Sequence, residues 1–144
     1  MPKVRESILV AASAERIYPI ISDFEQYPVI MESIKSVNVL EKGEGYSVTE
    51  WITDVDGIKI KWTEKDIFLP EEGKIEFKIL KGDLKKFDGY WAIEKHGDSS
   101  ELTFYVDFEL GIPMLARLLN PILVKKLRQN ICAMLEDLKK KVEE

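Results

Sequence analysis

The chain has 144 residues, of which 45% are hydrophobic and 33% charged, and its formal net charge is −5. This length and composition favour a single globular domain, residues 1–144, and the negative charge argues against a DNA-binding protein. The one cysteine, Cys132, excludes an internal disulfide, and the longest apolar runs are too short to span a membrane, so we expect a cytoplasmic protein.

The N-terminal part predicts one strand followed by two short helices. Residues Lys3 to Ala12 alternate between apolar and polar side chains, which is typical of a strand. Ser13 is a suitable N-cap for a helix that ends near Asp23, and Pro19 should shorten or bend this helix because proline removes a backbone hydrogen bond. Pro28 then favours the start of a second short helix.

The middle of the chain predicts an antiparallel meander. Turn signals such as Asp56-Gly57 and Glu72-Gly73 recur between segments in which apolar and polar residues alternate. An apolar face opposite a polar one is expected of a sheet that is covered on one side. The six strands expected here are residues 35–41, 46–55, 58–69, 74–81, 86–96 and 100–110.

The C-terminal part predicts a long amphipathic helix. Asn120 is a suitable N-cap, and Pro121 fits the first helical position. Residues 114–119 then form either a separate short helix or the upper part of one kinked helix. The apolar face, which we expect to cover the sheet, comprises Val124, Leu127, Ile131, Met134, Leu135, Leu138 and Val142.

This order of elements indicates an α+β fold. A seven-stranded, curved antiparallel sheet would close around the long C-terminal helix, with two short helices after strand 1. Large aromatic residues are concentrated in the predicted sheet, and large rings on a curved sheet spanned by a single helix leave space between the two layers. Such a space would be an apolar cavity with few polar groups, which is the usual form of a small-molecule site.

The sequence holds little that points to metal or reaction chemistry. His96, the only histidine, falls in the predicted turn before Gly97-Asp98, and we expect it to be a solvated loop residue. One histidine and one cysteine far apart in the sequence do not form a usual metal site, and no phosphate loop, dinucleotide motif or nucleophile elbow is present. We therefore expect no metal and no cofactor, and we name no catalytic residue.

Three carboxylates need a separate explanation. If Trp62 faces the core, strict alternation points Glu64 and Asp66 inward too, and the start of the preceding strand likewise predicts Glu50 inside. Buried carboxylates are costly unless they are paired, and cavities that hold them support acid–base chemistry. The alternative, which we favour here, is that a bulge switches the face or that these groups lie at an open rim beside lysines.

Several segments resemble a known family. The run from Val10 to Pro28 resembles the opening of the coenzyme-Q-binding and ribosome-association-toxin proteins, which belong to the polyketide cyclase/START-like (SRPBCC, helix-grip) superfamily. Leu80 to Trp91 resembles a segment of these proteins that contains glycine and tryptophan, and Leu102 to Leu110 resembles their last strand, which leads into the long helix. The order of these segments extends over nearly the whole chain.

The resemblance implies a helix-grip fold, with a lipophilic cavity between a seven-stranded sheet and the C-terminal helix. It also implies that the segment from Asp23 to Pro28 lies near the cavity entrance. The chain departs from the family where Gly82-Asp83-Leu84 replaces a Pro-Phe pair, and where Leu135 and Leu138 stand in place of Phe and Arg.

Three functions fit these features. The first, which we favour, is a carrier or sensor rather than an enzyme, binding a lipid, an isoprenoid quinone or a polycyclic aromatic through burial of apolar area. The second is a polyketide cyclase or dehydratase in which Glu64 or Asp66 moves a proton. The third is a module that docks on a ribosome or a protein through Lys125, Lys126 and Arg128.

For the carrier, we expect the ligand to contact residues of the second short helix, the sheet and the start of the long helix. These residues are Tyr27, Met31, Tyr46, Trp62, Glu64, Phe77, Trp91, Phe104, Phe108, Met114, Leu118, Leu119 and Ile122.

Overall fold

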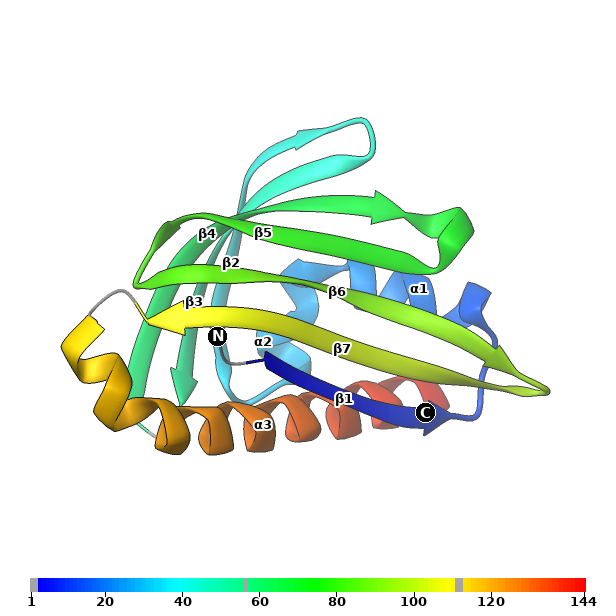
Figure 1. Ribbon diagram of the computed structural model, residues 1–144. Helices are drawn as coiled ribbons and strands as arrows, with labels where there is room; N and C mark the ends of the chain where they lie inside the picture. The colour runs from blue at the N-terminus through cyan, green and yellow to red at the C-terminus, as the bar shows by residue number, and fades with distance from the viewer. Residues whose placement is uncertain (1–2, 56, 111–112) are drawn as a thin grey trace.

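Antiparallel strands form a strongly curved sheet that wraps around one long helix (Figure 1). The computed structural model describes residues 3–55, 57–110 and 113–144, with the backbone alone for residues 58, 110, 113–120 and 123. Within these residues the sheet has seven strands in the order β1-β7-β6-β5-β4-β3-β2, which confirms the predicted fold class. The strands are β1 (Lys3–Val10), β2 (Ile34–Gly43), β3 (Tyr46–Val55), β4 (Ile58–Leu69), β5 (Lys74–Gly82), β6 (Leu84–His96) and β7 (Ser99–Leu110).

Short helices connect the two edge strands, β1 and β2. They are α1 (Ala14–Ser22), the 3₁₀ helix η1 (Phe24–Gln26) and α2 (Tyr27–Ile30). Pro19 lies inside α1, which has only nine residues, as expected of a helix that proline shortens. A further 3₁₀ turn, η2 (Pro70–Glu72), joins β4 to β5.

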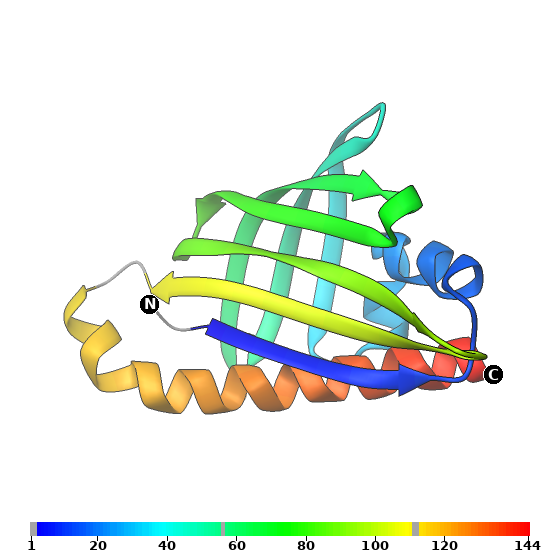
Figure 2. The ribbon, with the colours of Figure 1, turned by 45° about the vertical axis from the view of Figure 1, so that its right-hand side comes forward.

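Helix α3 (Pro113–Glu143) crosses the sheet and packs against β1 and β7 (Figure 2). Pro121 lies inside this helix, and the first turns stand at a clear angle to the remainder, so the kinked-helix alternative is the one that occurs. The predicted apolar face is confirmed, because Ile131, Leu135, Leu138 and Val142 are buried. No helix in the described ranges is long and apolar enough to cross a membrane.

The C-terminal end of α3 is tied to the corner between β1 and α1. Arg16 Nη2 donates to the carbonyl oxygen of Val142 at 2.8 Å, and Lys139 Nζ donates to that of Leu9 at 2.6 Å. The Ala11 amide donates to Glu143 Oε2 at 2.9 Å. These contacts fix the position of α3 over the sheet and thereby set the width of the space beneath it.

A bulge on β5 leaves the alternation of β4 intact. Thr63 pairs with Lys81 whereas Glu64 pairs with Ile79, so the extra residue is on β5. Gly82 follows the bulge with φ 141°, and a Cβ there would lie 2.5 Å from the Cα of Trp62, so only glycine lets the two strands approach so closely. The bulge expected from the sequence thus exists, but on the neighbouring strand, and it does not turn Glu64 outward.

Candidate functional site

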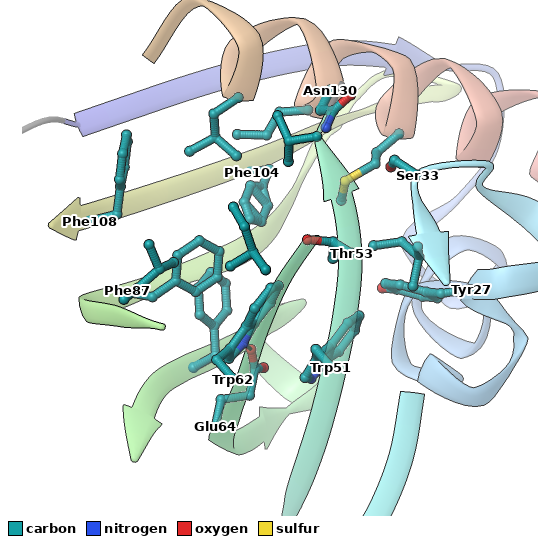
Figure 3. Close-up of a pocket in the computed structure, with 18 of the residues that line it drawn as sticks. Tyr27, Ser33, Trp51, Thr53, Trp62, Glu64, Phe87, Phe104, Phe108 and Asn130 are labelled. Atoms are coloured by element: carbon teal, nitrogen blue, oxygen red, sulfur yellow. Dashed lines mark hydrogen bonds between the residues drawn. The ribbon is translucent and has the colours of Figure 1, made fainter. Parts of the chain in front are cut away.

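A cavity of about 70 Å³ lies between the inner face of the sheet and α3 (Figure 3). Strands β3 to β7 supply its floor and walls, and Leu127, Asn130, Ile131 and Met134 of α3 supply its roof. Nine of the described lining residues are aromatic, namely Phe24, Tyr27, Trp51, Trp62, Phe77, Phe87, Trp91, Phe104 and Phe108. The site is therefore apolar and rich in flat ring surfaces.

Eight of these rings, all except Phe108, form one continuous set of contacts. Trp51 and Trp62 lie on paired strands and stack with an interplanar angle of 2° and centroids 5.9 Å apart. Trp62 in turn contacts Phe87 at 4.8 Å between ring centroids. At the other wall, Trp91 meets Phe104 edge to face at 4.7 Å. Such pairs add to the stability that burial alone provides, so the cavity has ordered walls.

Glu64 supplies the carboxyl group among the described lining residues, and its side chain is shown in Figure 3. Its Oε1 accepts a hydrogen bond of 2.7 Å from Trp62 Nε1. The residue is only 4% exposed and presents a carboxyl group to a largely apolar space. Both sequence alternatives are therefore wrong for Glu64, because its burial excludes an open rim and the bulge lies on β5.

A second carboxylate, Asp66, lies behind Glu64 on the same face of β4 and is fully buried. Its Oδ2 accepts hydrogen bonds from Thr49 at 2.7 Å and from Ser47 at 3.0 Å. Thr49 itself accepts a hydrogen bond of 2.7 Å from Trp51 Nε1, which links this network to the cavity wall. Asp66 Oδ1, although buried, receives no such donor from the described residues.

The two carboxyls influence each other. Burial raises the pKa of Glu64 well above its ordinary value of 4.5, and the neighbouring Asp66 raises it further. Burial also raises the pKa of Asp66, but hydrogen bonds from Glu64, Thr49 and Ser47 oppose that effect. The pKa of Glu64 is thus the more strongly raised of the two, because three hydrogen bonds favour the ionised form of Asp66 whereas only that of Trp62 favours the ionised form of Glu64.

Other polar groups line the cavity nearer to α3. Figure 3 shows Ser33 and Asn130 at that end, across the cavity from Glu64, and Thr53 between them and Glu64. The hydroxyl of Tyr27 instead donates to the carbonyl oxygen of Ile21, so its ring faces the cavity while its polar end is bonded within the wall. The cavity therefore offers polar contacts at two ends of an aromatic chamber.

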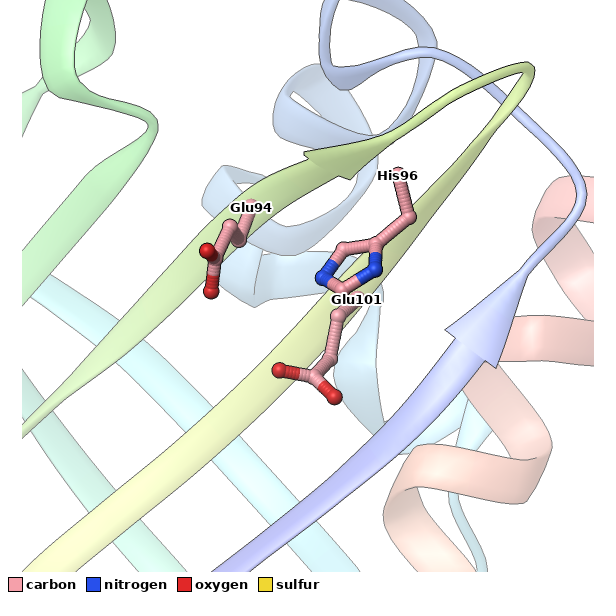
Figure 4. A group of neighbouring side chains, drawn as sticks. All are labelled: Glu94, His96 and Glu101. Atoms are coloured by element: carbon pink, nitrogen blue, oxygen red, sulfur yellow. The ribbon is translucent and has the colours of Figure 1, made fainter.

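His96 lies near two carboxylates on the outer surface (Figure 4). One ligand atom each of Glu94, His96 and Glu101 lies within 4.8 Å of the others. His96 is exposed, as predicted, but it is the last residue of β6 rather than a loop residue, and the sequence did not indicate the neighbouring carboxylates. Exposed acidic groups gather in this way on many surfaces without a metal, so this cluster does not by itself define a metal site.

The cations predicted as a ribosome-docking face lie on α3. Lys125 is exposed and borders an open surface depression together with Lys126. Arg128 Nη1, however, donates to Glu6 Oε1 of β1 at 2.8 Å. The carboxylate of Glu6 thus neutralises the charge of Arg128, so this face of α3 is less basic than the sequence alone indicates.

Comparison with known proteins shows the family to which the chain belongs. A family model described as polyketide cyclase/dehydrase and lipid transport matches residues 10–135. The chain belongs to this family. Membership confirms the resemblance inferred from the sequence, since the match extends from the end of β1 into α3.

Relatives in the polyketide cyclase/dehydrase family have different named roles. Ribosome association toxin RatA of Escherichia coli K12 is 26% identical over 110 residues, 76% of this chain and 69% of RatA. The actinorhodin polyketide synthase bifunctional cyclase/dehydratase of Streptomyces coelicolor is 25% identical over 108 residues, 74% of this chain. The latter match spans only 34% of that enzyme's length.

Solved structures share the whole fold. A START superfamily protein from Mycobacterium smegmatis superposes with a TM-score of 0.84 at 27% identity, covering 98% of this chain and 97% of that one. The protein TTHA0849 from Thermus thermophilus superposes with a TM-score of 0.92 at 24% identity, covering 98% and 97%. The Zhui aromatase/cyclase from a Streptomyces species gives 0.87 at 23% identity, covering 99% and 93%. The fold is START-like, as predicted.

The structure brings together seven of the site residues predicted for this family member. Tyr27, Trp62, Glu64, Phe77, Trp91, Phe104 and Phe108 all line the cavity. Met31 is buried in the core but is not among the lining residues, and Ile122 is 54% exposed. The side chains of Met114, Leu118 and Leu119 lie outside the described part of the chain.

The prediction for β3 placed the wrong face inward. Tyr46 points away from the cavity and its hydroxyl donates to Glu41 at 2.9 Å, and Glu50 lies 4.0 Å from Lys61 on the same outer face. The inner face instead carries every second residue from Ser47 to Val55, which includes Thr49 and Trp51. Lining residues missed for this reason or not selected are Phe24, Ser33, Ile34, Trp51, Thr53, Val55, Ile60, Leu84, Phe87, Leu127, Asn130, Ile131 and Met134.

Proposed function

We propose that this protein binds a hydrophobic small molecule between the sheet and α3 and acts as a carrier or sensor. The observation that carries the proposal is the cavity with nine aromatic lining residues and one inward carboxyl. Among the ligand classes considered, a polycyclic aromatic fits these ring surfaces better than a lipid chain or an isoprenoid quinone tail, because flat rings stack on flat walls. Membership of a family described by lipid transport supports the proposal.

Binding requires the cavity to widen. Its volume of about 70 Å³ is smaller than the roughly 150 Å³ of an apolar cavity that accommodates benzene. A polycyclic ligand must therefore displace some wall side chains, and Leu127 and Met134 of α3, which are only partly buried, are the least confined of these. The gain from burying apolar ligand area has to exceed the cost of this movement.

The three tryptophans of the chain give a direct readout, because Trp51, Trp62 and Trp91 all line the cavity. The uncharged dye N-phenyl-1-naphthylamine should show saturable energy transfer from these tryptophans on titration. We expect Leu127→Phe, which fills part of the cavity, to weaken this uptake about tenfold or more. Ile122→Phe adds a ring on the exposed part of the same helix and should leave uptake unchanged.

The absence of saturable energy transfer in the wild-type protein would contradict the proposal if native mass spectrometry of the purified protein also finds no bound small molecule. Equal loss of uptake in both phenylalanine variants would mean that the dye binds on the surface of α3 rather than in the cavity. Thermal unfolding of each variant checks that the fold is retained.

A cyclase or dehydratase is the second candidate, favoured by the proton-holding carboxyl at the cavity wall. Glu64 faces the cavity and is paired with Asp66, which is an arrangement able to deliver and recover a proton. The named activity of the Streptomyces coelicolor relative belongs to the same reaction class. Incubation with a short poly-β-ketone, which also cyclises slowly without a catalyst, discriminates the two functions. An enzyme accelerates formation of a cyclised product over the reaction without protein, and Glu64→Gln removes that acceleration while dye uptake persists. A carrier gives no acceleration.

A further inference from the structure

The Glu64–Asp66 pair carries a definite charge. Glu64 and Asp66 lie two residues apart on the inner face of β4 and are both buried, and two neighbouring carboxyls bond to each other only when one of them carries a proton. Asp66 Oδ2 is already bonded to two hydroxyls, whereas its buried Oδ1 has no hydroxyl, amide or amino donor among the described residues. The Glu64 carboxyl is the neighbour able to satisfy that oxygen. Together the two groups hold one proton and one negative charge.

Uncharged groups surround this pair. The donors that reach it are the hydroxyls of Ser47 and Thr49 and the indole of Trp62. The buried phenol of Tyr27 lies close enough for the two carboxyls to raise its pKa further, after burial itself, which is the main cause. Lys65, between the two carboxyls in sequence, is exposed on the opposite face of β4. The negative charge is therefore held by hydrogen bonds at the cavity wall rather than by a buried cation.

We propose that Glu64 and Asp66 act as one recognition unit that selects uncharged aromatic ligands carrying a hydroxyl group and rejects the corresponding carboxylates. This inference rests on the proposed binding function and adds the ligand class. Glu64 Oε1 accepts one hydrogen bond from Trp62 and retains a second lone pair for a ligand hydroxyl. A Glu64 proton donated to the charged Asp66 polarises the Glu64 carboxyl, which makes Oε1 a stronger acceptor than that of an isolated carboxylic acid.

The same charge disfavours an anion. In a cavity wall of low dielectric, two like charges a few ångströms apart repel each other far more than they do in water. A ligand carboxylate would also lose its hydration among nine aromatic rings without meeting a cation there among the described lining residues. The pair thus supplies both an attractive and a repulsive element for the selection of ligands.

Three probes that share one ring system separate the attraction for a hydroxyl group from the repulsion of an anion. They are 2-naphthol, 2-methoxynaphthalene, which lacks the donor, and 2-naphthoate, which is an anion, each measured by displacement of N-phenyl-1-naphthylamine. For the wild-type protein we expect 2-naphthol to bind about tenfold more tightly than the methyl ether, and 2-naphthoate to bind most weakly.

Isosteric variants then assign the selection to the pair. The double variant Glu64→Gln with Asp66→Asn is neutral, and its affinity for 2-naphthoate relative to 2-naphthol should rise about tenfold or more. Glu64→Gln alone keeps the Asp66 charge and should still reject the anion. Glu50→Gln removes a carboxylate from the outer face of the sheet, near Lys61, and should leave the ranking of the three probes unchanged. If the double variant does not fold, Asp66→Asn alone answers the question, because buried Glu64 then remains protonated and the pair is neutral.

The outcomes distinguish this inference from the proposed function. Uptake of the dye with equal affinity for all three probes, or with no displacement by any of them, overturns the inference and leaves the proposed function in place. An unchanged rejection of 2-naphthoate by the neutral variant also overturns it. Failure of the wild-type protein to take up either the dye or any probe contradicts the proposed function itself.

Discussion

Thr49→Val is expected to lower the free energy of unfolding by about 2–4 kcal/mol, measured by urea denaturation at neutral pH. The Thr49 hydroxyl donates to Asp66 Oδ2 at 2.7 Å and accepts from Trp51 Nε1 at 2.7 Å. Valine has almost the same shape but can neither donate nor accept a hydrogen bond. The substitution therefore leaves the buried carboxylate of Asp66 short of one donor and the buried indole N–H of Trp51 without its acceptor. Each buried polar group stranded in this way costs roughly 1–3 kcal/mol.

Thr53→Val is the matched control, because Thr53 lies on the same strand and the same face. Its hydroxyl borders the cavity, and its removal strands neither Asp66 nor Trp51. We expect it to change stability by less than about 1 kcal/mol. Equal effects of the two substitutions would show that the Thr49 network contributes nothing beyond the loss of a hydroxyl.

The strands were predictable because their boundaries depend on local chemistry. Strands β3 and β4 begin and end where the sequence analysis placed them, since Gly45 and Gly57 adopt the positive φ values that the turns require. The long amphipathic face of α3 was predictable for a similar reason, because helical periodicity repeats over several turns. Whether Pro121 begins a helix or kinks one depends on tertiary packing, and the local sequence is compatible with both.

The inner face of β3 was mispredicted although the sequence held the necessary information. The tight turn after Val55 sets the register of β3 against β4, and this register pairs Trp51 with Trp62. Directly paired residues lie on the same face of a sheet, so an inward Trp62 requires an inward Trp51 and, two residues earlier, Thr49. The prediction instead relied on Tyr46 and Val48 at the start of the strand, and these residues lie on the outer face.

The buried carboxyls were harder to predict because a favourable arrangement depends on three strands at once. Glu64 pairs directly with Thr49, and Asp66 with Ser47, so hydroxyls of β3 meet carboxyls of β4. Because the bulge lies on β5, the alternation of β4 continues and Glu64 stays inward. Local sequence shows only an unfavourable charge in the core, and the donors that compensate for it become visible only with the register.

The same pair makes stability depend on pH, and Glu64→Gln is expected to remove the part of that dependence that comes from Glu64. In the unfolded chain both carboxyls ionise near their ordinary pKa values of 4.5 and 3.8. In the folded protein both pKa values are raised, so the folded state keeps a proton that the unfolded state releases. The stabilisation from this proton is complete below the unfolded pKa values and is lost as pH rises through the raised pKa of Glu64.

Between the unfolded pKa of Glu64 and its raised folded pKa, a one-proton difference lowers the stability of the wild-type protein by about 1.4 kcal/mol per pH unit relative to Glu64→Gln. Glutamine accepts the hydrogen bond from Trp62 and donates one to Asp66 without ionising, so it mimics the protonated glutamate at every pH. Denaturation curves for both proteins at closely spaced pH values give the difference directly. Glu50→Gln removes an outer-face carboxylate near Lys61 and should retain the wild-type slope. Parallel curves for wild type and Glu64→Gln would mean that no proton is held between the two carboxyls, and the selection of ligands argued from that proton would lose its basis.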